Sequence, residues 1–344
     1  MRVLITGGAG FIAHHVVETL LNETDYEIVC LDRLDFSGNL NRLHDVISNM
    51  DPVFGRIKIV YHDLKSEVSP LTAKMIGQVD YILHLAAGSH VDRSIEYPME
   101  FVMDNVVGTC NILQFARTQT RLKQFVYFST DEVFGPAPDG VKYKEYDRYN
   151  STNPYSASKA GGEELCVAFQ NTYSLPVVIT HTMNVFGERQ HPEKYIPMCI
   201  RKIAAGETVT IHSNPEKTKA GSRHYIHAKD VADGLLRIME VNYAEHVIVP
   251  NGDYGGAKCP KYNLVGPEEI DNLELAMHIA CAQSKPLIYE MVDFHSTRPG
   301  HDLRYALDGD RMKYVLGWEP KVKLSERIKQ VTNWTLINKR WLDI

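Results

Sequence analysis

Short, almost wholly apolar runs alternate with longer helical patterns along the first half of the chain. The apolar runs are Val3–Thr6, Glu27–Leu31, Ile57–Tyr61, Tyr81–His84, Phe125–Phe128 and Val177–Thr180. Apolar positions at helical spacing fill Gly10–Asn22, Met99–Arg117 and Pro154–Thr172. Strands that are apolar on both sides are typical of a parallel sheet covered by helices on both faces. The pattern therefore predicts a doubly wound α/β fold, which binds ligands beyond the carboxyl ends of its strands.

The alternation loosens after Asn184, where proline, glycine and charged loops become more frequent. This change predicts a smaller, mixed domain that binds substrate. Residues 225–250 are expected to return to the first domain as a helix and a strand. The predicted division is therefore 1–184 with about 225–250 for the first domain, and 185–224 with 251–344 for the second.

Composition and charge narrow the class of protein. The chain has 344 residues, of which 44% are hydrophobic and 23% charged, so it can bury a sizeable core. The formal net charge of -6 gives no reason to expect a nucleic-acid partner. The six cysteines form no C-x-x-C pair, and no secretory or membrane-spanning pattern is present. We expect a cytoplasmic protein with no membrane partner and no bound metal.

A glycine-rich turn joins the first predicted strand to the first predicted helix. Gly7, Gly10 and Ala13 have the spacing G-x-x-G-x-x-A. Phe11 and Ile12 follow the second glycine and begin the helix. Glycine lets the backbone approach a pyrophosphate, which binds at a helix N-terminus. The turn predicts a Rossmann-like dinucleotide site, with an ordinary glycine-rich turn as the alternative.

The end of the second predicted strand indicates which dinucleotide binds. Asp32 lies 25 residues after Gly7, where a carboxylate accepts hydrogen bonds from a ribose diol and repels a 2′-phosphate. NAD is therefore favoured over NADP, although the next residue, Arg33, is able to pair with a 2′-phosphate. After the fourth strand, the small residues of Leu85-Ala86-Ala87 leave room for a flat cofactor. Tight packing explains these small residues equally well.

Candidate chemistry follows the fifth strand. Tyr155 and Lys159 form Y-x-x-x-K, which places both side chains on one helix face. An ammonium group nearby stabilises a phenolate, so the pair is expected to take a proton from a sugar hydroxyl. Thr130 ends the strand and is able to bond the same hydroxyl. Asp131 and Glu132 come next and are interpreted as a paired acid and base.

These motifs resemble those of the extended short-chain dehydrogenase/reductases and, among them, the nucleotide-sugar 4,6-dehydratases. The similarity spans nearly the whole chain, and the Thr-Asp-Glu triplet with Arg-Pro-Gly-His-Asp is its most specific part. The stretches that carry it are Asp35–Leu40, Ser89–Ser94, Ser129–Gly135, Pro192–Pro197 and Arg298–Asp302. One departure is the segment Ser213–Arg223, which is longer than the usual loop.

The resemblance implies a lyase that uses NAD and is redox-neutral overall. Tyr155 would remove the proton of the C4 hydroxyl while hydride passes to NAD. Glu132 would then remove the C5 proton, and Asp131 would protonate the departing C6 hydroxyl. The hydride would return to C6, giving a 4-keto-6-deoxy sugar nucleotide. The resemblance favours dTDP-glucose as substrate, but the residues alone do not select the base or the hexose.

The resemblance also assigns further residues to the two ligands. On the cofactor side these are Gly7, Gly10, Phe11, Ile12, Asp32, Asp63, Leu64, Leu85, Ala86, Ala87, Ser89, Asn105, Tyr155 and Lys159. On the substrate side they are Ser89, His90, Thr130, Asn184, Lys194, Tyr195, Arg223, Asn272 and His301. Plainer roles stay open for four of them: a loop cap for Asp63, a surface position for Arg223, a helix cap for Asn272 and loop packing for His301.

Other functions share part of this set of motifs. A C4 epimerase or a C6 decarboxylase shares the glycine turn and the Tyr/Lys pair, but an epimerase does not need Asp131 and Glu132. A 5,6-dehydratase would differ only in where the hydride returns. A non-catalytic NAD sensor would not need the reactive residues.

The resemblance further implies a homodimer, in which Met99–Arg117 and Pro154–Thr172 pack as a four-helix interface.

Overall fold

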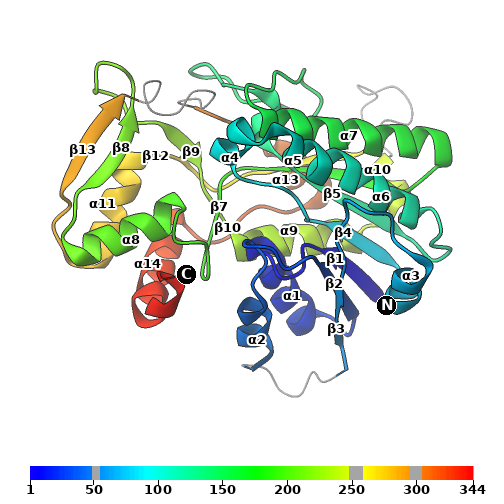
Figure 1. Cartoon of the computed structure of the whole chain (residues 1–344). Coiled ribbons are helices and arrows are strands. Elements are labelled where there is room, and N and C mark those ends of the chain that lie inside the picture. The colour runs from blue at the N-terminus through cyan, green and yellow to red at the C-terminus, as the bar shows by residue number, and fades with distance from the viewer. Residues whose placement is uncertain (49–54, 248–258, 294–303, 344) are drawn as a thin grey trace.

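A parallel sheet forms the centre of the protein (Figure 1). The computed structural model describes residues 1–48, 55–247, 259–293 and 304–343. The sheet has seven strands in the order β11-β6-β5-β4-β1-β2-β3, which confirms the predicted doubly wound fold. Its strands are β1 (Arg2–Thr6), β2 (Glu27–Asp32), β3 (Ile57–Tyr61), β4 (Tyr81–His84), β5 (Gln124–Thr130), β6 (Val177–Thr182) and β11 (Lys261–Leu264). The strand order reverses between β1 and β4, so a crevice opens at the carboxyl edge there.

Helices cover both faces of this sheet (Figure 1). One face carries α1 (Phe11–Glu23), α2 (Leu40–Ser48), α9 (Ala228–Glu240), α10 (Tyr243–Val247) and α13 (Asp310–Leu316). The other carries α3 (Pro70–Ile76), α4 (Val91–Glu96), α5 (Pro98–Val102), η1 (Met103–Val107), α6 (Gly108–Ala116) and α7 (Pro154–Tyr173).

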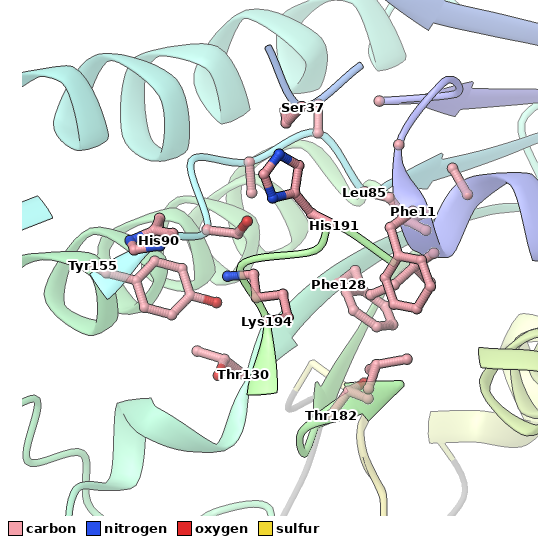
Figure 2. A pocket seen from close by; sticks show the side chains of 18 of the residues that line it. Phe11, Ser37, Leu85, His90, Phe128, Thr130, Tyr155, Thr182, His191 and Lys194 are labelled. Carbon is pink, nitrogen blue, oxygen red and sulfur yellow. The ribbon is translucent and has the colours of Figure 1, made fainter. Parts of the chain in front are cut away.

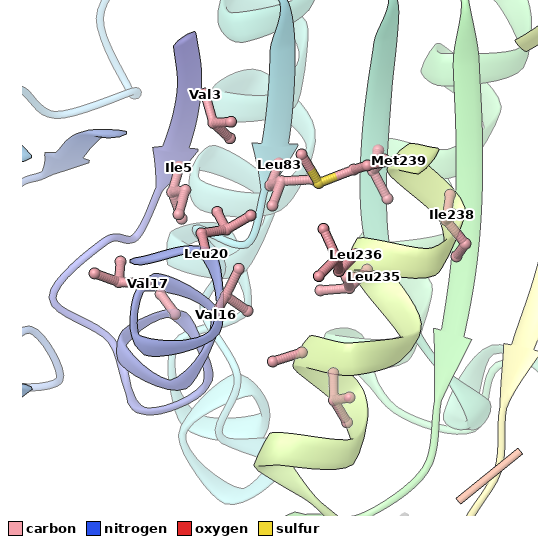
Figure 3. Close-up of a cluster of buried hydrophobic side chains, with 14 of the residues drawn as sticks. Val3, Ile5, Val16, Val17, Leu20, Leu83, Leu235, Leu236, Ile238 and Met239 are labelled. Atoms are coloured by element: carbon pink, nitrogen blue, oxygen red, sulfur yellow. The ribbon is translucent and has the colours of Figure 1, made fainter. Parts of the chain in front are cut away.

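Strand residues alternate between the two cores. Val3 and Ile5 pack toward α1 and α9 (Figure 3). Leu4 between them packs toward α6 and α7. Successive side chains of a strand point to opposite faces of the sheet. Because both faces are covered, both sets of positions must be apolar, and this explains the continuous apolar runs in the sequence.

A smaller part of the chain lies beside the carboxyl edge of the sheet and has its own apolar core (Figure 1). Its strands form three two-stranded pairs, β8 with β13, β9 with β12 and β7 with β10. The elements are β7 (Val185–Phe186), α8 (Tyr195–Ala205), β8 (Val209–Ser213), β9 (Ser222–His224), β10 (Ile226–His227), β12 (Glu269–Asp271), α11 (Asn272–Ala282), β13 (Tyr289–Asp293) and α14 (Leu324–Ile337). Two 3-10 turns complete the described chain, η2 (Asp131–Phe134) and η3 (Lys339–Trp341).

The expected return of residues 225–250 to the large domain needs a correction. The helix is present as α9, but residues 243–247 form the helix α10 and the returning strand is β11, at 261–264. The assignment of all of 251–344 to the smaller domain is therefore wrong at β11, which pairs with β6. Lys261 and Asn263 are buried in this strand, and their polarity concealed it in the sequence. The assignment is also wrong at α13, whose Met312 and Leu316 pack in the core of the large sheet, and the rest of the predicted division stays a prediction.

One expected helix is also interrupted. Residues 99–117 were expected to form a single helix, but Met103–Val107 is a π-helical segment between α5 and α6. Such segments often occur at functional sites because they redirect side chains. Among the described residues, no helix is long and apolar enough to cross a membrane.

Candidate active site

A cavity of about 520 Å³ opens at the carboxyl edge of the large sheet and extends to the smaller part (Figure 2). Most of the predicted site residues line it. They are Gly7, Gly10, Phe11, Ile12, Asp32, Asp63, Leu64, Leu85, Ala86, Ala87, Ser89, His90, Thr130, Asp131, Glu132, Tyr155, Lys159, Asn184, Lys194, Tyr195, Arg223 and Asn272. His301 lies outside the described residues.

The glycine turn brings bare backbone to the cavity wall. Gly7 has φ +68, and a Cβ there would lie 2.9 Å from the backbone of Ala86. A Cβ on Gly10 would lie 2.8 Å from the carbonyl oxygen of Gly7. Helix α1 begins after Gly10 without a side-chain cap. Its first N–H groups are therefore suited to an anionic ligand such as a pyrophosphate.

Carboxylates line the next part of the cavity. Asp32 is nearly buried, and its oxygens accept hydrogen bonds from the N–H groups of Ala9 (2.9 Å) and Leu34 (2.8 Å). These bonds hold the carboxylate at the end of β2. Asp63 accepts a bond from the N–H of Lys65 at 3.0 Å, so it both lines the cavity and caps its own turn.

Asn105 lies behind the cavity wall, and it is not among the residues that line the cavity. Its side chain accepts a hydrogen bond from the N–H of Gly88 (2.9 Å) and donates to the carbonyl of Gly88 (3.0 Å) and to Ser158 (2.9 Å). The direct cofactor contact expected for Asn105 is therefore not supported. The residue instead fixes the backbone of the loop after β4, because the π-helical segment turns its side chain into the core.

Thr130 organises the acidic residues that follow β5. Its hydroxyl donates to Oδ1 of Asp131 at 3.0 Å and accepts from the N–H of Glu132 at 3.3 Å. Burial raises the pKa of Asp131 to about 6, although Arg223 acts in the opposite direction. The second oxygen of Asp131 is buried and has no hydrogen-bond partner within the described part of the chain. Asp131 therefore binds a proton more readily near neutral pH than an exposed carboxyl does.

Glu132 is oriented by the start of α7. Its Oε2 accepts a hydrogen bond from Nδ2 of Asn153 at 2.9 Å. Asn153 also caps the helix, since its side chain accepts from the N–H of Ser156 at 2.8 Å, and Pro154 is the first helical residue. The cap that starts the helix therefore also fixes the position of a candidate base.

Tyr155 and Lys159 both line the cavity, and Figure 2 shows the Tyr155 side chain there. Burial and the Glu132 carboxylate raise the pKa of Tyr155, whereas a hydrogen bond with Thr130 lowers it. The expected lowering of this pKa is therefore wrong for the protein alone. The Lys159 ammonium donates to the carbonyl of Phe128 at 2.7 Å, and burial lowers its pKa to about 8. Further positive charge at the cavity is needed to favour the phenolate.

The smaller part of the chain contributes polar groups from α8, β9 and α11. The hydroxyl of Tyr195 donates to the carbonyl of Asn272 at 2.6 Å, and that of Tyr225 donates to Oδ1 of Asn272 at 2.8 Å. Asp271, not Asn272, caps α11, so the helix-cap alternative for Asn272 is wrong. Arg223 lies over the ring of Tyr305 at 4.6 Å, which is unlike a solvated surface arginine.

Sequence reasoning missed several residues that line the cavity. They include Phe128, Thr182, His191, His212, Tyr225 and Tyr305. Phe128 and Thr182 lie near the ends of β5 and β6, and the rule that ligands bind at this edge could have found them. The others come from loops and short strands whose residue types carry no local signal.

The fold and these side chains define a class, the dinucleotide-binding enzymes that carry a Tyr/Lys pair at the edge of a doubly wound sheet. The profile of the family described as GDP-mannose 4,6 dehydratase matches residues 4–331, and the chain belongs to this family. The predicted resemblance to nucleotide-sugar 4,6-dehydratases is thereby confirmed.

Individual relatives agree with this assignment. The chain is 33% identical to a dTDP-glucose 4,6-dehydratase of Escherichia coli, over 99% of this chain and 95% of the relative. It is 33% identical to that of Haemophilus influenzae, over 98% of each. The structure of the Streptomyces venezuelae dTDP-glucose 4,6-dehydratase with NAD and TYD bound has a TM-score of 0.84, with 32% identity over 99% of this chain and 98% of that one. A Thermus thermophilus UDP-glucose 4-epimerase complex with NAD is also similar, with a TM-score of 0.81 and 26% identity over 97% of this chain and 98% of that one.

Proposed function

We propose that this protein is an NAD-dependent dTDP-glucose 4,6-dehydratase, a hydro-lyase that forms the 4-keto-6-deoxy sugar nucleotide. The observation that carries the proposal is the adjacent pair Asp131 and Glu132 on the wall of the cavity that also holds Tyr155. Elimination of water across C5 and C6 needs a base at one carbon and an acid at the other. Epimerisation at C4 needs neither group. The similar relatives named above are dTDP-glucose 4,6-dehydratases.

NAD fits the residues of the large part. A Cβ on Gly7 or Gly10 would strike the backbone of Ala86 or Gly7, so glycine keeps this turn tight, and the N-terminus of α1, which has no side-chain cap, is left for the pyrophosphate. Asp32 would accept hydrogen bonds from the ribose hydroxyls. NAD held by these residues would supply the reversible hydride acceptor that oxidation at C4 and reduction at C6 need. We assign the nucleotide sugar to the smaller part and the cofactor to the larger.

Tyr155 would take the proton from the C4 hydroxyl. Thr130 supports this role, because its hydrogen bond lowers the pKa of the phenol while burial and Glu132 raise it. Lys159 would supply part of the positive charge that the phenolate needs. Its carbonyl partner, Phe128, keeps the ammonium at the end of β5, on the wall of the cavity.

The two carboxylates would carry out the elimination. Glu132, oriented by Asn153, would remove the C5 proton that the new ketone acidifies. Asp131 would give its proton to the departing C6 hydroxyl, and its raised pKa of about 6 makes it protonated more often near neutrality than an exposed carboxyl. Different environments thus separate the roles of two chemically similar neighbours.

Arg223 is the proposed ligand of the substrate diphosphate. Its planar guanidinium can bond two phosphate oxygens at once. Asn272 is fixed by two tyrosine hydroxyls and would present its remaining amide atoms to the substrate. Asn184 and Lys194 line the same part of the cavity and would complete the contacts.

The function is tested by incubating the protein with dTDP-glucose, UDP-glucose, CDP-glucose and GDP-mannose. We expect dTDP-glucose to lose one water and to gain a C6 methyl group, as read by mass spectrometry and NMR. Inversion at C4 without water loss would instead establish a 4-epimerase. A 5,6-alkene product would establish a 5,6-dehydratase. Bound NAD without any conversion would support a sensor.

We further propose that the protein acts in the cytoplasm as a homodimer. The cysteines in the structure are free thiols, which suits a reducing compartment. Apolar side chains are exposed on the surface formed by α4 and α5, among them Ile95, Met99 and Val102. Packing of this surface with α6 and α7 against a second copy would remove the apolar area from water.

A further inference from the structure

Arg33 directly follows Asp32, where a cation is a natural ligand for the 2′-phosphate of NADP. In the folded chain its guanidinium is engaged by carboxylates. Nη1 and Nη2 donate to Oδ1 and Oδ2 of Asp104 at 2.5 and 2.9 Å. Nε donates to Oδ2 of Asp35 at 2.8 Å. All three guanidinium nitrogens therefore already have a carboxylate partner on the wall of the cavity.

Asp104 reaches Arg33 because of the π-helical segment Met103–Val107. The next residue, Asn105, anchors this segment by binding the backbone of Gly88 on both its N–H and its carbonyl. A Cβ on Gly88 would lie 3.3 Å from Oδ2 of Asp104, so the glycine leaves room for the carboxylate. The Asp104 side chain is mostly buried, with 11% of its surface exposed.

The charges around Arg33 disfavour a further anion. Asp63 lies 3.6 Å from Nη1 of Arg33, and Lys65 lies 3.4 Å from Oδ1 of Asp104. Asp32, Asp35, Asp63 and Asp104 line the cavity with three cations of the same region, Arg33, Arg42 and Lys65, so the carboxylates still outnumber the cations. A 2′-phosphate that took Arg33 from Asp104 would leave a mostly buried carboxylate beside a new anion, and like charges repel strongly there.

We propose that Asp104 is a positioning residue for cofactor choice, which makes the site reject NADP by occupying the Arg33 guanidinium. The inference rests on the proposed use of a dinucleotide. Asp32 would act directly on the ribose, whereas Asp104 acts only through Arg33. Removing the Asp104 charge therefore frees the Arg33 guanidinium to bind the 2′-phosphate of NADP.

The test is the ratio of the dissociation constants for NADP and NAD. Isotope-labelled nucleotide is exchanged into the purified protein and quantified by mass spectrometry after release. In Asp104→Asn and Asp104→Ala we expect NADP binding to improve about 10-fold or more relative to NAD, since a charge-assisted pair changes affinity on that scale. The double variant Arg33→Ala/Asp104→Asn should lose this gain, and Asp104→Glu should keep the NAD preference. Asp139→Asn, which removes an exposed partner of Lys219, is the matched control.

An unchanged ratio in both single variants would overturn the inference, and so would a gain that persists without Arg33. A gain of the same size in Asp139→Asn would overturn it as well, because the effect would then be one of net charge. If the variants fail in one of these ways but the wild-type protein still prefers NAD, only the inference on Asp104 falls and the proposed function stands. Wild-type protein that binds neither dinucleotide would overturn both.

Discussion

At the scale of single residues, the surroundings of Asp131 and Glu132 set them apart. Asp131 is buried beside Thr130 and has a raised pKa of about 6, whereas Glu132 is half-buried and accepts a hydrogen bond from Asn153. A carboxyl group with a raised pKa is the better suited of the two to act as the acid. The other, held ready as an acceptor, is suited to be the base.

Tyr155→Phe tests the oxidation. The variant keeps the ring but has no hydroxyl to take the C4 proton, so we expect the turnover number to fall about 10²–10⁴-fold. Tyr173→Phe, at the exposed end of the same helix, is the control and should turn over normally. Steady-state assays of product formation provide the measurement. Near-normal turnover in Tyr155→Phe would refute the proposed role of the phenol.

Glu132→Gln and Asp131→Asn separate the two halves of the elimination. Glu132→Gln should form the 4-keto sugar but place little deuterium at C5 in deuterated water, because the base is absent. Asp131→Asn should exchange the C5 hydrogen faster than it loses water, because the acid is absent. Rapid-quench mass spectrometry follows both events.

The opposite pattern would reverse the two assignments. Joint loss of exchange and elimination in each variant would indicate that the neighbours share a proton. Normal water loss in both variants would make the pair structural and would remove the main support for a dehydratase.

At the scale of elements, α7 links the cavity to a buried ionic network. Glu163 follows Lys159 by one helical turn, and its Oε1 accepts a hydrogen bond from Ser129 at 2.5 Å. Its Oε2 lies 3.2 Å from Nε2 of His181 and 3.3 Å from Nζ of Lys261. The network therefore joins α7 to β5, β6 and β11. The Glu163 charge also raises the pKa of Lys159 against the lowering effect of burial.

Glu163→Gln should move the pH dependence of turnover. Without the carboxylate, the charged form of Lys159 is less stable, so its pKa falls below about 8. Lys159 then loses its proton at lower pH, and the alkaline limb of the turnover profile shifts to lower pH. Glu164→Gln, its exposed neighbour on α7, is the matched control. A profile that keeps its alkaline limb in Glu163→Gln would contradict the coupling.

At the scale of the whole molecule, the exposed apolar surface on α4 and α5 tests the assembly. Met99 is 67% exposed, and Met99→Glu would bury a charge in the proposed dimer interface. We expect the mass measured by light scattering to fall from two chains to one. Leu71→Glu, at a site that is 69% exposed on α3, is the control and should leave the dimer intact. A single-chain mass for the wild type would refute the homodimer.

Local chemistry made part of this protein predictable. The apolar strands, the glycine turn and the Tyr155/Lys159 spacing each depend on neighbours in sequence, so their residue types and spacing suffice to predict them. The same holds for the carboxylate of Asp32, which follows its strand directly. Polar residues that are buried by distant partners were missed, as Lys261 and Asn263 in β11 show.

The sequence by itself thus determined the doubly wound sheet, its ligand-binding edge and most of the reactive side chains. Only the tertiary structure decided the charge states at that edge and the partner of each cation. Burial raises the pKa of both Tyr155 and Asp131, and burial depends on segments far away along the chain. The pairing of Arg33 with Asp104 spans 71 residues and needs the π-helical segment to bring the two together. The spacing of apolar residues and the residue types of turns are encoded locally in the sequence. Burial from solvent and ion pairing between distant residues arise only when the chain has folded.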